Sequence, residues 1–318
     1  MSVTRRQFIT TGGAAAGIAV TALTATALGA SSATARSRVL TTPTWMLAGA
    51  GFANLAAKSL GGDPAVCRRA FNTGRTWFIT TYTGDTTIPS PVPAGYTGVA
   101  VLKFKCYQDG STGLVDALAA GLPSWVTAVQ YDAESWAQTP DLEQGAWLLN
   151  PHTQTSYAQL FCATAHSHGL KVVLTPGNDL CNNSPNPAYP QRKPQYPVTS
   201  KDAGQNYNAF IRHNMAAAAQ YLQPGDIFEY QAQQLELDTE AYTTVTTKVA
   251  EQVEAANPAT LFLAGLGRSK PPSDGANCAD LAAAATGVAD TAAGFWLNVG
   301  AYSSQVRPMI CALRKLGY

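Results

Sequence analysis

Two carboxylates and an amide, spaced two residues apart, follow a short apolar run in the first half of the chain. Residues 130–136 read Q-Y-D-A-E-S-W, directly after the apolar run at 125–129. Because successive side chains of a strand point to opposite faces, Gln130, Asp132 and Glu134 are expected to share one face. The two acids would lie roughly 6–7 Å apart, close enough for the charge of one to keep the other protonated as a general acid. The alternative is a solvated surface turn, but the apolar run favours a buried strand.

A second polar face is expected on the segment at 226–233, where Glu229, Gln231 and Gln233 alternate with apolar residues. Polar or aromatic residues at other expected strand ends are Lys103, Lys105, Tyr107, Asn178, Asp179, Arg268, Trp296 and Asn298. Each taken alone is typical of a structural contact, for example a buried ion pair of Lys105 with Asp132. Together they indicate a polar pocket, because an ordinary barrel interior is layered with branched apolar residues.

Several other kinds of catalysis lack the residues that they need. The chain has no G-x-S-x-G motif, and no histidine falls at an expected strand end; the four are His152, His166, His168 and His213. Ser-His-Asp catalysis therefore lacks its general base, and metal hydrolysis that relies on histidine lacks its metal ligands. A Schiff base on Lys103 or Lys105 stays open, although a salt bridge explains either lysine more simply. Carboxylate chemistry is what the sequence favours.

The elements that must position these residues alternate between strand and helix. Expected strands span 45–52, 75–83, 99–107, 126–134, 170–175, 226–233, 261–266 and 293–299. Expected helices span 53–59, 113–120, 156–168, 201–222, 239–256, 278–288 and 306–316. This alternation predicts an α/β fold, a single (β/α)8 barrel of the TIM type, with its site at the carboxyl ends of the strands. A doubly wound open sheet is the alternative, but residues 49–52 lack the third glycine of a dinucleotide-binding loop.

Two proline-rich segments interrupt this pattern. The stretch at 88–95 leaves little room for a full helix and is expected to be a connection. The longer irregular segment at 176–199 is expected to form a wall or lid of the site.

Residues 1–35 are expected to be a twin-arginine signal peptide, followed by the catalytic barrel at 36–318. Residues 4–9 read T-R-R-Q-F-I, a mildly apolar segment follows at 12–29, and residues 33–35 read A-T-A. The formal net charge of +1 gives no reason to expect nucleic acid or an anionic membrane as a partner. We expect a secreted monomer without a cofactor.

Six cysteines are an even count, which is typical of disulfide bonding in an oxidising compartment. None is spaced as C-x-x-C, which argues against zinc. Cys181 and Cys278 both follow expected strands, so a bridge between them across one barrel end is the favoured pairing. Buried free thiols are the alternative for Cys162 and Cys311, which lie in helical segments.

Carboxylates together with aromatic rings favour a glycosidase, because flat apolar rings match the C–H faces of sugars. Aromatic residues at or near the expected strands are Trp45, Trp77, Tyr107, Trp136, Tyr230 and Trp296. Trp77 is more typical of a core residue. Trp136 stands just past the two acids, where its ring would face a substrate. The expected substrate-binding residues are Gln130, Trp136, Asn178, Asp179, Gln231, Trp296 and Asn298.

Residues 131–134, Y-D-A-E, resemble the end of the chitinase-type D-x-D-x-E motif, and equally the D-x-E of barrel muramidases. The resemblance implies a secreted hydrolase of an N-acetylglucosamine-containing polymer with Glu134 as general acid/base. It implies that Asp132 orients the 2-acetamido group, which acts as the nucleophile. By the same resemblance Tyr230 would stabilise the reaction intermediate, and the ring of Trp296 would form the floor of the sugar-binding site.

Other mechanisms and functions stay open. Glu229 is the best candidate if the nucleophile is a protein carboxylate, and its distance from Glu134 would then indicate retention or inversion. A carbohydrate-binding barrel without catalysis is consistent with Gln130, which stands where the chitinase motif has its first acid. A metal-dependent hydrolase or lyase would use Asp132, Glu134, Glu229 and Asp179 as oxygen ligands for Mg²⁺ or Ca²⁺.

Overall fold

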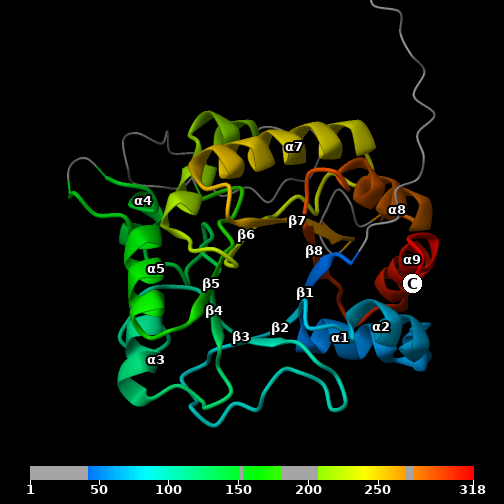
Figure 1. Ribbon diagram of the computed structural model, residues 1–318, viewed down its shortest axis with the longest axis horizontal. Coiled ribbons are helices and arrows are strands. Elements are labelled where there is room, and N and C mark those ends of the chain that lie inside the picture. Colours follow the sequence, from blue (N-terminus) through cyan, green and yellow to red (C-terminus); the bar gives the residue numbers. More distant parts are fainter. Residues whose placement is uncertain (1–41, 151–152, 181–206, 269–274) are drawn as a thin grey trace, which may run out of the picture. The chain divides into compact units, whose positions relative to one another are not determined.

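The computed structural model describes residues 42–150, 153–180, 207–268 and 275–318, and in these ranges it is a closed barrel of eight parallel strands (Figure 1). The strands are β1 (Thr44–Ala48), β2 (Thr76–Thr81), β3 (Val99–Phe104), β4 (Ala128–Tyr131), β5 (Lys171–Leu174), β6 (Ile227–Tyr230), β7 (Leu261–Gly267) and β8 (Gly294–Asn298). Each strand pairs with the next one along the chain, and β8 pairs with β1. The predicted (β/α)8 barrel is therefore confirmed.

Helices surround the barrel on its outside (Figure 1). They are α1 (Gly49–Ala56), α2 (Pro64–Phe71), α3 (Leu114–Ala120), α4 (Asp141–Gly145), α5 (Tyr157–Ser167), α7 (Thr239–Ala256), α8 (Cys278–Gly287) and α9 (Ser303–Lys315), with 3-10 turns at η1 (Lys58–Leu60) and η2 (Met215–Tyr221). Capping by side chains explains where several of these helices begin, and α2 is an example. In α2, Asp63 Oδ1 accepts from the backbone N–H groups of Ala65 and Val66, and Pro64 occupies the first turn.

The alternation of side chains along the strands builds two apolar layers. Inward-facing residues form a small cluster inside the barrel: Met46, Trp77, Ile79, Val101, Ala128, Val173, Ile227 and Leu263. Outward-facing residues such as Phe78, Tyr131 and Phe228 join the large cluster that contains the buried helix residues. Each strand is thus buried on both faces, as a parallel sheet requires.

Some predicted boundaries are wrong. The strand expected at 45–52 ends at Ala48, because the small apolar residues from Gly49 onward form α1. Helices α2 and α4 were not predicted. The helix expected at 201–222 lies partly outside the described residues, and its described part is broken at Asn214, where φ is 49°. Residues 207–212 are helical before the break, and η2 follows it.

The cysteine pairing differs from the prediction. Cys278, at the start of α8, forms a disulfide with Cys311 in α9. The expected Cys181–Cys278 bridge is therefore wrong, as is a free thiol at Cys311, and Cys181 itself lies outside the described residues. Cys162 is a buried free thiol, as the alternative predicted, and so are Cys67 and Cys106. Burial raises the pKa of the Cys67 and Cys106 thiols to about 12.

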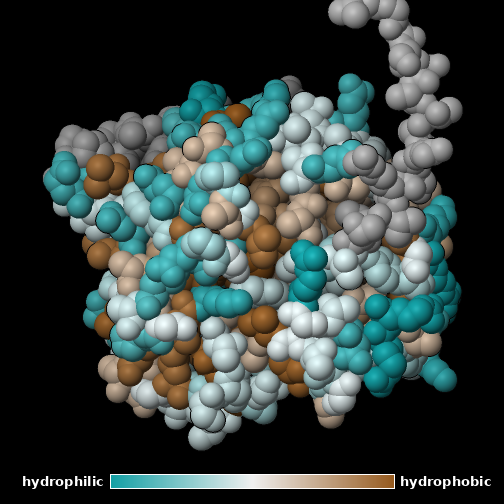
Figure 2. Space-filling view, viewed as in Figure 1, coloured by the Kyte–Doolittle hydropathy of each residue, from teal (hydrophilic) through white to brown (hydrophobic). Residues whose placement is uncertain are grey.

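The surface in Figure 2 mixes hydrophilic and hydrophobic residues, with several hydrophobic ones near its centre. Large hydrophobic side chains that are exposed come from separate elements: Leu142, Leu149, Leu160, Leu237 and Tyr302. Among the described helices, none has the length and apolar character needed to span a bilayer.

We expect removal of the disulfide to destabilise the barrel. Cys278→Ser combined with Cys311→Ser should lower the free energy of unfolding by about 3–4 kcal/mol, because the bond joins residues 33 positions apart and restricts the unfolded chain. Urea denaturation measures the difference. Reductant should shift the midpoint of the unaltered chain and leave that of the double variant unchanged, and equal midpoints for both chains would contradict the prediction.

Candidate active site

The barrel interior is apolar at one level and polar at the next. Towards the carboxyl ends of the strands, the inward positions two residues after cluster members are taken by Lys103, Gln130, Thr175 and Glu229. Trp296 packs against the apolar cluster opposite Met46. Lys103 and Gln130 are direct register partners on β3 and β4. The polar pocket predicted from alternating residues therefore begins one layer above Val101 and Ala128.

The backbone ladder of β4 continues past its last assigned residue, Tyr131. Asp132 N donates to Phe104 O at 2.8 Å, and Gly177 N donates to Ala133 O at 2.7 Å. This extended course keeps the side chains of Asp132 and Glu134 on the inner side of the barrel. A side chain on Gly177 would not fit, because its Cβ would come within 2.8 Å of Glu134 Cγ.

Gln231, from the segment after β6, holds the two acids together. Its Nε2 donates to Glu134 Oε1 at 3.0 Å and lies 3.4 Å from Asp132 Oδ1. Lys103 Nζ lies 2.8 Å from the other carboxylate oxygen of Asp132. The expected partner of Asp132 was Lys105, and that prediction is wrong: Lys105 Nζ lies 4.9 Å from the centre of the Trp136 ring.

The charges of this cluster act on Lys103. Burial opposes its charge, but attraction and a hydrogen bond from Asp132, followed by attraction from Glu134 and Glu229, outweigh that effect and raise the pKa of the ammonium group above its ordinary value. Lys103 therefore stays charged at neutral pH, with three carboxylates around it.

Glu229 lies deeper than the other two acids. Its side chain is 0% exposed, whereas Asp132 is 5% exposed and Glu134 is half-buried. Gly265 on β7 makes room for it, because a Cβ there would come within 3.1 Å of Glu229 Oε1 and 2.2 Å of Gln233 Oε1. Glu134 is thus the most accessible of the three carboxylates.

Two expected substrate-binding residues hold loops in place. Asn178 Nδ2 donates to the backbone oxygen of Gln231, and Asp179 Oδ1 accepts from Ser135 N at 3.4 Å. These bonds tie the loop after β5 to the segments that carry Gln231 and Glu134.

The aromatic residues divide between the site and the core. Trp296 on β8 is half-buried and lines a cavity at the barrel mouth. Trp136 donates from Nε1 to Thr139 Oγ1 at 2.8 Å and stacks beneath the Lys105 ammonium. Asn298 is half-buried beside Gly267, where a Cβ would lie 3.1 Å from Asn298 Cβ.

Tyr230 faces away from the site. Its ring packs against Tyr207 and Phe210 at 5.9 and 5.1 Å between centroids, in the layer between barrel and helices. Because it stands between Glu229 and Gln231, both of which point inward, strand alternation directs it outward. The structure therefore does not bring Tyr230 to the acids, where the expected role of steadying an intermediate would place it.

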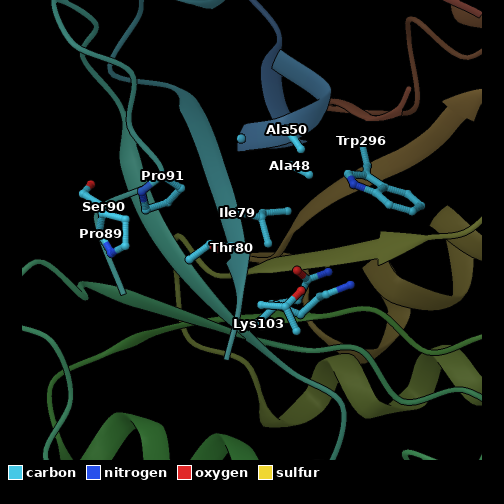
Figure 3. Close-up of a pocket in the computed structure, with 12 residues that line it drawn as sticks. Ala48, Ala50, Ile79, Thr80, Pro89, Ser90, Pro91, Lys103 and Trp296 are labelled. Atoms are coloured by element: carbon cyan, nitrogen blue, oxygen red, sulfur yellow. The ribbon is translucent and has the colours of Figure 1, made fainter. Parts of the chain in front are cut away.

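A cavity of about 440 Å³ opens at the barrel mouth, and Lys103, which bonds to Asp132, belongs to its lining (Figure 3). Its lining residues are Ala48, Gly49, Ala50, Ile79, Thr80, Thr81, Pro89, Ser90, Pro91, Lys103, Gln130 and Trp296. The Pro89–Pro91 segment forms one wall, although the sequence indicated only a connection there. Its anchor is Trp125, whose Nε1 donates to Ile88 O at 2.8 Å.

A fourth buried acid, Glu143, was not predicted and lies outside the barrel. It accepts from the hydroxyl of Tyr131 at 2.5 Å and from the backbone N–H groups of Tyr107 and Gln108 at 2.7 and 3.1 Å. Burial raises the pKa of Glu143 despite these donors. These contacts fix the loop after β3 against α4. Glu143 therefore helps to position the loops next to the site and is not part of the barrel interior.

No three His, Cys, Asp or Glu side chains of the described ranges are grouped so that they could hold a metal ion. Asp132, Glu134, Glu229 and Asp179 were the candidate oxygen ligands, and within those ranges their geometry provides no such site.

We expect Lys103→Met to lower the free energy of unfolding by about 3–5 kcal/mol, because it leaves the buried Asp132 carboxylate without its cation. Adding Asp132→Asn to the variant should recover most of the loss. The matched control is Lys105→Met, which removes a cation–π contact and should cost about 0.5–1 kcal/mol. Chemical denaturation measures all three variants, and equal losses for the two lysines would refute the assigned ion pair.

Comparison of the sequence with models of protein families and with curated proteins finds no match. The barrel mouth combines two linked acids, one half-buried lysine, a deeper third acid and a cavity with an aromatic wall.

Proposed function

We propose that this chain is an exported glycoside hydrolase in which Glu134 is the general acid/base. The observation that carries the proposal is the double contact of Gln231 Nε2 with Asp132 and Glu134 at the open end of the barrel. The two acids share one amide donor, and one of them is accessible. An accessible carboxyl group beside a second acid can protonate a leaving group and then activate water.

The two acids differ in their surroundings, which supports different roles. Asp132 is buried and bound by the Lys103 ammonium, so it contributes a fixed negative charge beside the reaction centre. Glu134 accepts from Gln231 Nε2 and is half-buried, which supports the role of the group that exchanges a proton with a glycosidic oxygen. Glu229, being fully buried, is poorly placed to attack a sugar directly. This favours the substrate-assisted route, in which a 2-acetamido group is the nucleophile.

The neighbouring cavity supports a carbohydrate as substrate. It combines an indole ring, two prolines and an isoleucine with hydroxyl, amide and ammonium groups. Ligand sites are typically apolar with a few placed polar groups, and this size is within their usual range of about 300–1,000 Å³. The resemblance of residues 131–134 to chitinase and muramidase motifs suggests an N-acetylglucosamine-containing polymer.

Export is part of the proposal. The T-R-R-Q-F-I sequence at 4–9 supports twin-arginine transport, and the Cys278–Cys311 disulfide is typical of an oxidising compartment.

A carbohydrate-binding barrel without catalysis is the second candidate. It is favoured by the complete burial of Glu229 and by the ion pair of buried Asp132 with Lys103, which leave Glu134 as the one accessible carboxylate of the three.

We expect residues 36–318 to release reducing sugar from one member of a panel of chitin, peptidoglycan and plain glucans. Glu134→Gln should lower the rate at least about 100-fold, because the amide cannot exchange the proton. The control is Glu254→Gln, an exposed acid on α7, which should keep full activity.

Activity that survives EDTA and depends on Glu134 would support the acid/base role. Sugar binding without turnover in every variant would favour the second candidate. Activity that Glu134→Gln leaves intact would refute the proposed role of Glu134.

A further inference from the structure

Gln130 carries a buried polar atom that points to a ligand. The residue is 1% exposed, and its Nε2 donates to Thr175 Oγ1 at 2.9 Å. Its Oε1 is also buried, and no donor of the described chain lies within hydrogen-bond distance of it. Leaving such an acceptor unsatisfied is costly, so groups of this kind usually receive a hydrogen bond from something. Gln130 lines the cavity at the barrel mouth, where a bound molecule could supply that donor.

Lys103 lines the same cavity next to Gln130. The two residues are register partners on adjacent strands, and both point inward. An ammonium group has three N–H donors, and one of those on Lys103 is directed to Asp132 Oδ2. The cavity floor therefore offers a strong donor and an unsatisfied acceptor side by side.

This pairing selects the chemistry of the ligand. A carboxylate or a fully ionised phosphate ester accepts from Lys103 but has no hydrogen to donate to Gln130 Oε1. An ammonium group donates to Gln130 but cannot accept from Lys103. A hydroxyl group does both, since its oxygen accepts while its hydrogen donates.

The walls of the cavity fit a flat ring that bears hydroxyl groups. Trp296 lies on one side and Pro89, Ser90 and Pro91 lie on the other, with Lys103 between and below them (Figure 3). Apolar faces on both sides and polar groups at the floor match a pyranose, whose C–H groups form its faces and whose hydroxyls project from its edge.

We propose that this cavity is a neutral sugar subsite in which one ring hydroxyl bridges Lys103 Nζ and Gln130 Oε1. The inference deepens the proposed glycosidase function and rests on it for the reaction at the neighbouring acids. Because Lys103 also contacts Asp132, the proposed subsite lies next to the Asp132 carboxylate.

The test is calorimetric titration of the Glu134→Gln chain, which binds without turnover, with N-acetylglucosamine, glucose, galactose, mannose and xylose. At least one sugar should bind, and Gln130→Met added to this chain should weaken its binding roughly tenfold. The matched control is Gln252→Met: Gln252 is an amide on α7 whose Nε2 donates to Ile211 O, and its loss should leave the affinity unchanged.

Monodeoxy analogues of the bound sugar make the test specific. In the Glu134→Gln chain, removal of one particular hydroxyl should weaken binding at least roughly tenfold, because it removes the hydrogen bonds to both Gln130 and Lys103. In the chain that also carries Gln130→Met, the same deoxygenation should weaken binding clearly less than in the Glu134→Gln chain, because the hydrogen bond to Gln130 is already lost and only the one from Lys103 remains to be removed. If the Gln130 variant does not fold, the deoxy series on the first chain still decides.

Three results would overturn the subsite: no sugar of the panel binds, no single hydroxyl matters, or the effects of deoxygenation and of Gln130→Met simply add. Hydrolysis that depends on Glu134 without this coupling would refute the subsite and leave the proposed function standing. Coupled binding without any hydrolysis would retain the sugar site and refute the glycosidase.

Discussion

The Lys103 ammonium is the charge on which the polar half of the barrel depends. Asp132, Glu134 and Glu229 face one closed interior, and carboxylates confined to a region of low dielectric repel one another strongly. Lys103 interacts with all three and bonds directly to Asp132. Its position follows from strand register, which sets it opposite Gln130 and one layer above the apolar cluster. The closed barrel thus brings acids from β4 and β6 to one cation from β3, and the amide of Gln231 completes the link between them.

Much of the fold follows from hydrophobic alternation, because a parallel strand buried on both faces and an amphipathic helix leave different patterns. The helix at 239–256 has the predicted bounds, and the strand at 261–267 differs by one residue. The failures have physical causes. The apolar residues after Ala48 suit a strand or a helix equally, and tertiary packing decides for α1. The turn at Asn214 depends on a left-handed conformation that periodicity does not reveal. The Cys278–Cys311 pairing depends on how α8 meets α9, which no spacing encodes.

Residues of the candidate site were predictable where the alternation along a single strand decides which way a side chain points. They were not predictable where the answer depends on the register between two strands. Alternation alone places Asp132 and Glu134 on one side, and the same rule applied to β6 excludes Tyr230, which lies between two inward-facing residues. The choice between Lys103 and Lys105 as partner of Asp132 needs the register between β3 and β4, because both lysines have the same parity. The wall formed by Pro89–Pro91 depends on the path of a loop, and its anchor on Trp125 comes from a residue far along the chain.

The barrel mouth separates reactive groups from recognition groups. The acids and Gln231 come from β4 and β6, whereas the cavity walls come from the ends of β1, β2 and β8 and from the loop at 89–91; Figure 1 shows these two sets of strands on opposite sides of the barrel. Lys103 and Gln130 lie where the two regions meet, since each lines the cavity and belongs to the polar layer. A substitution in Pro89 or Trp296 would therefore alter which ring fits without moving the carboxylates. A substitution at Lys103 would disturb both, because the same ammonium group holds Asp132 and lines the proposed sugar subsite.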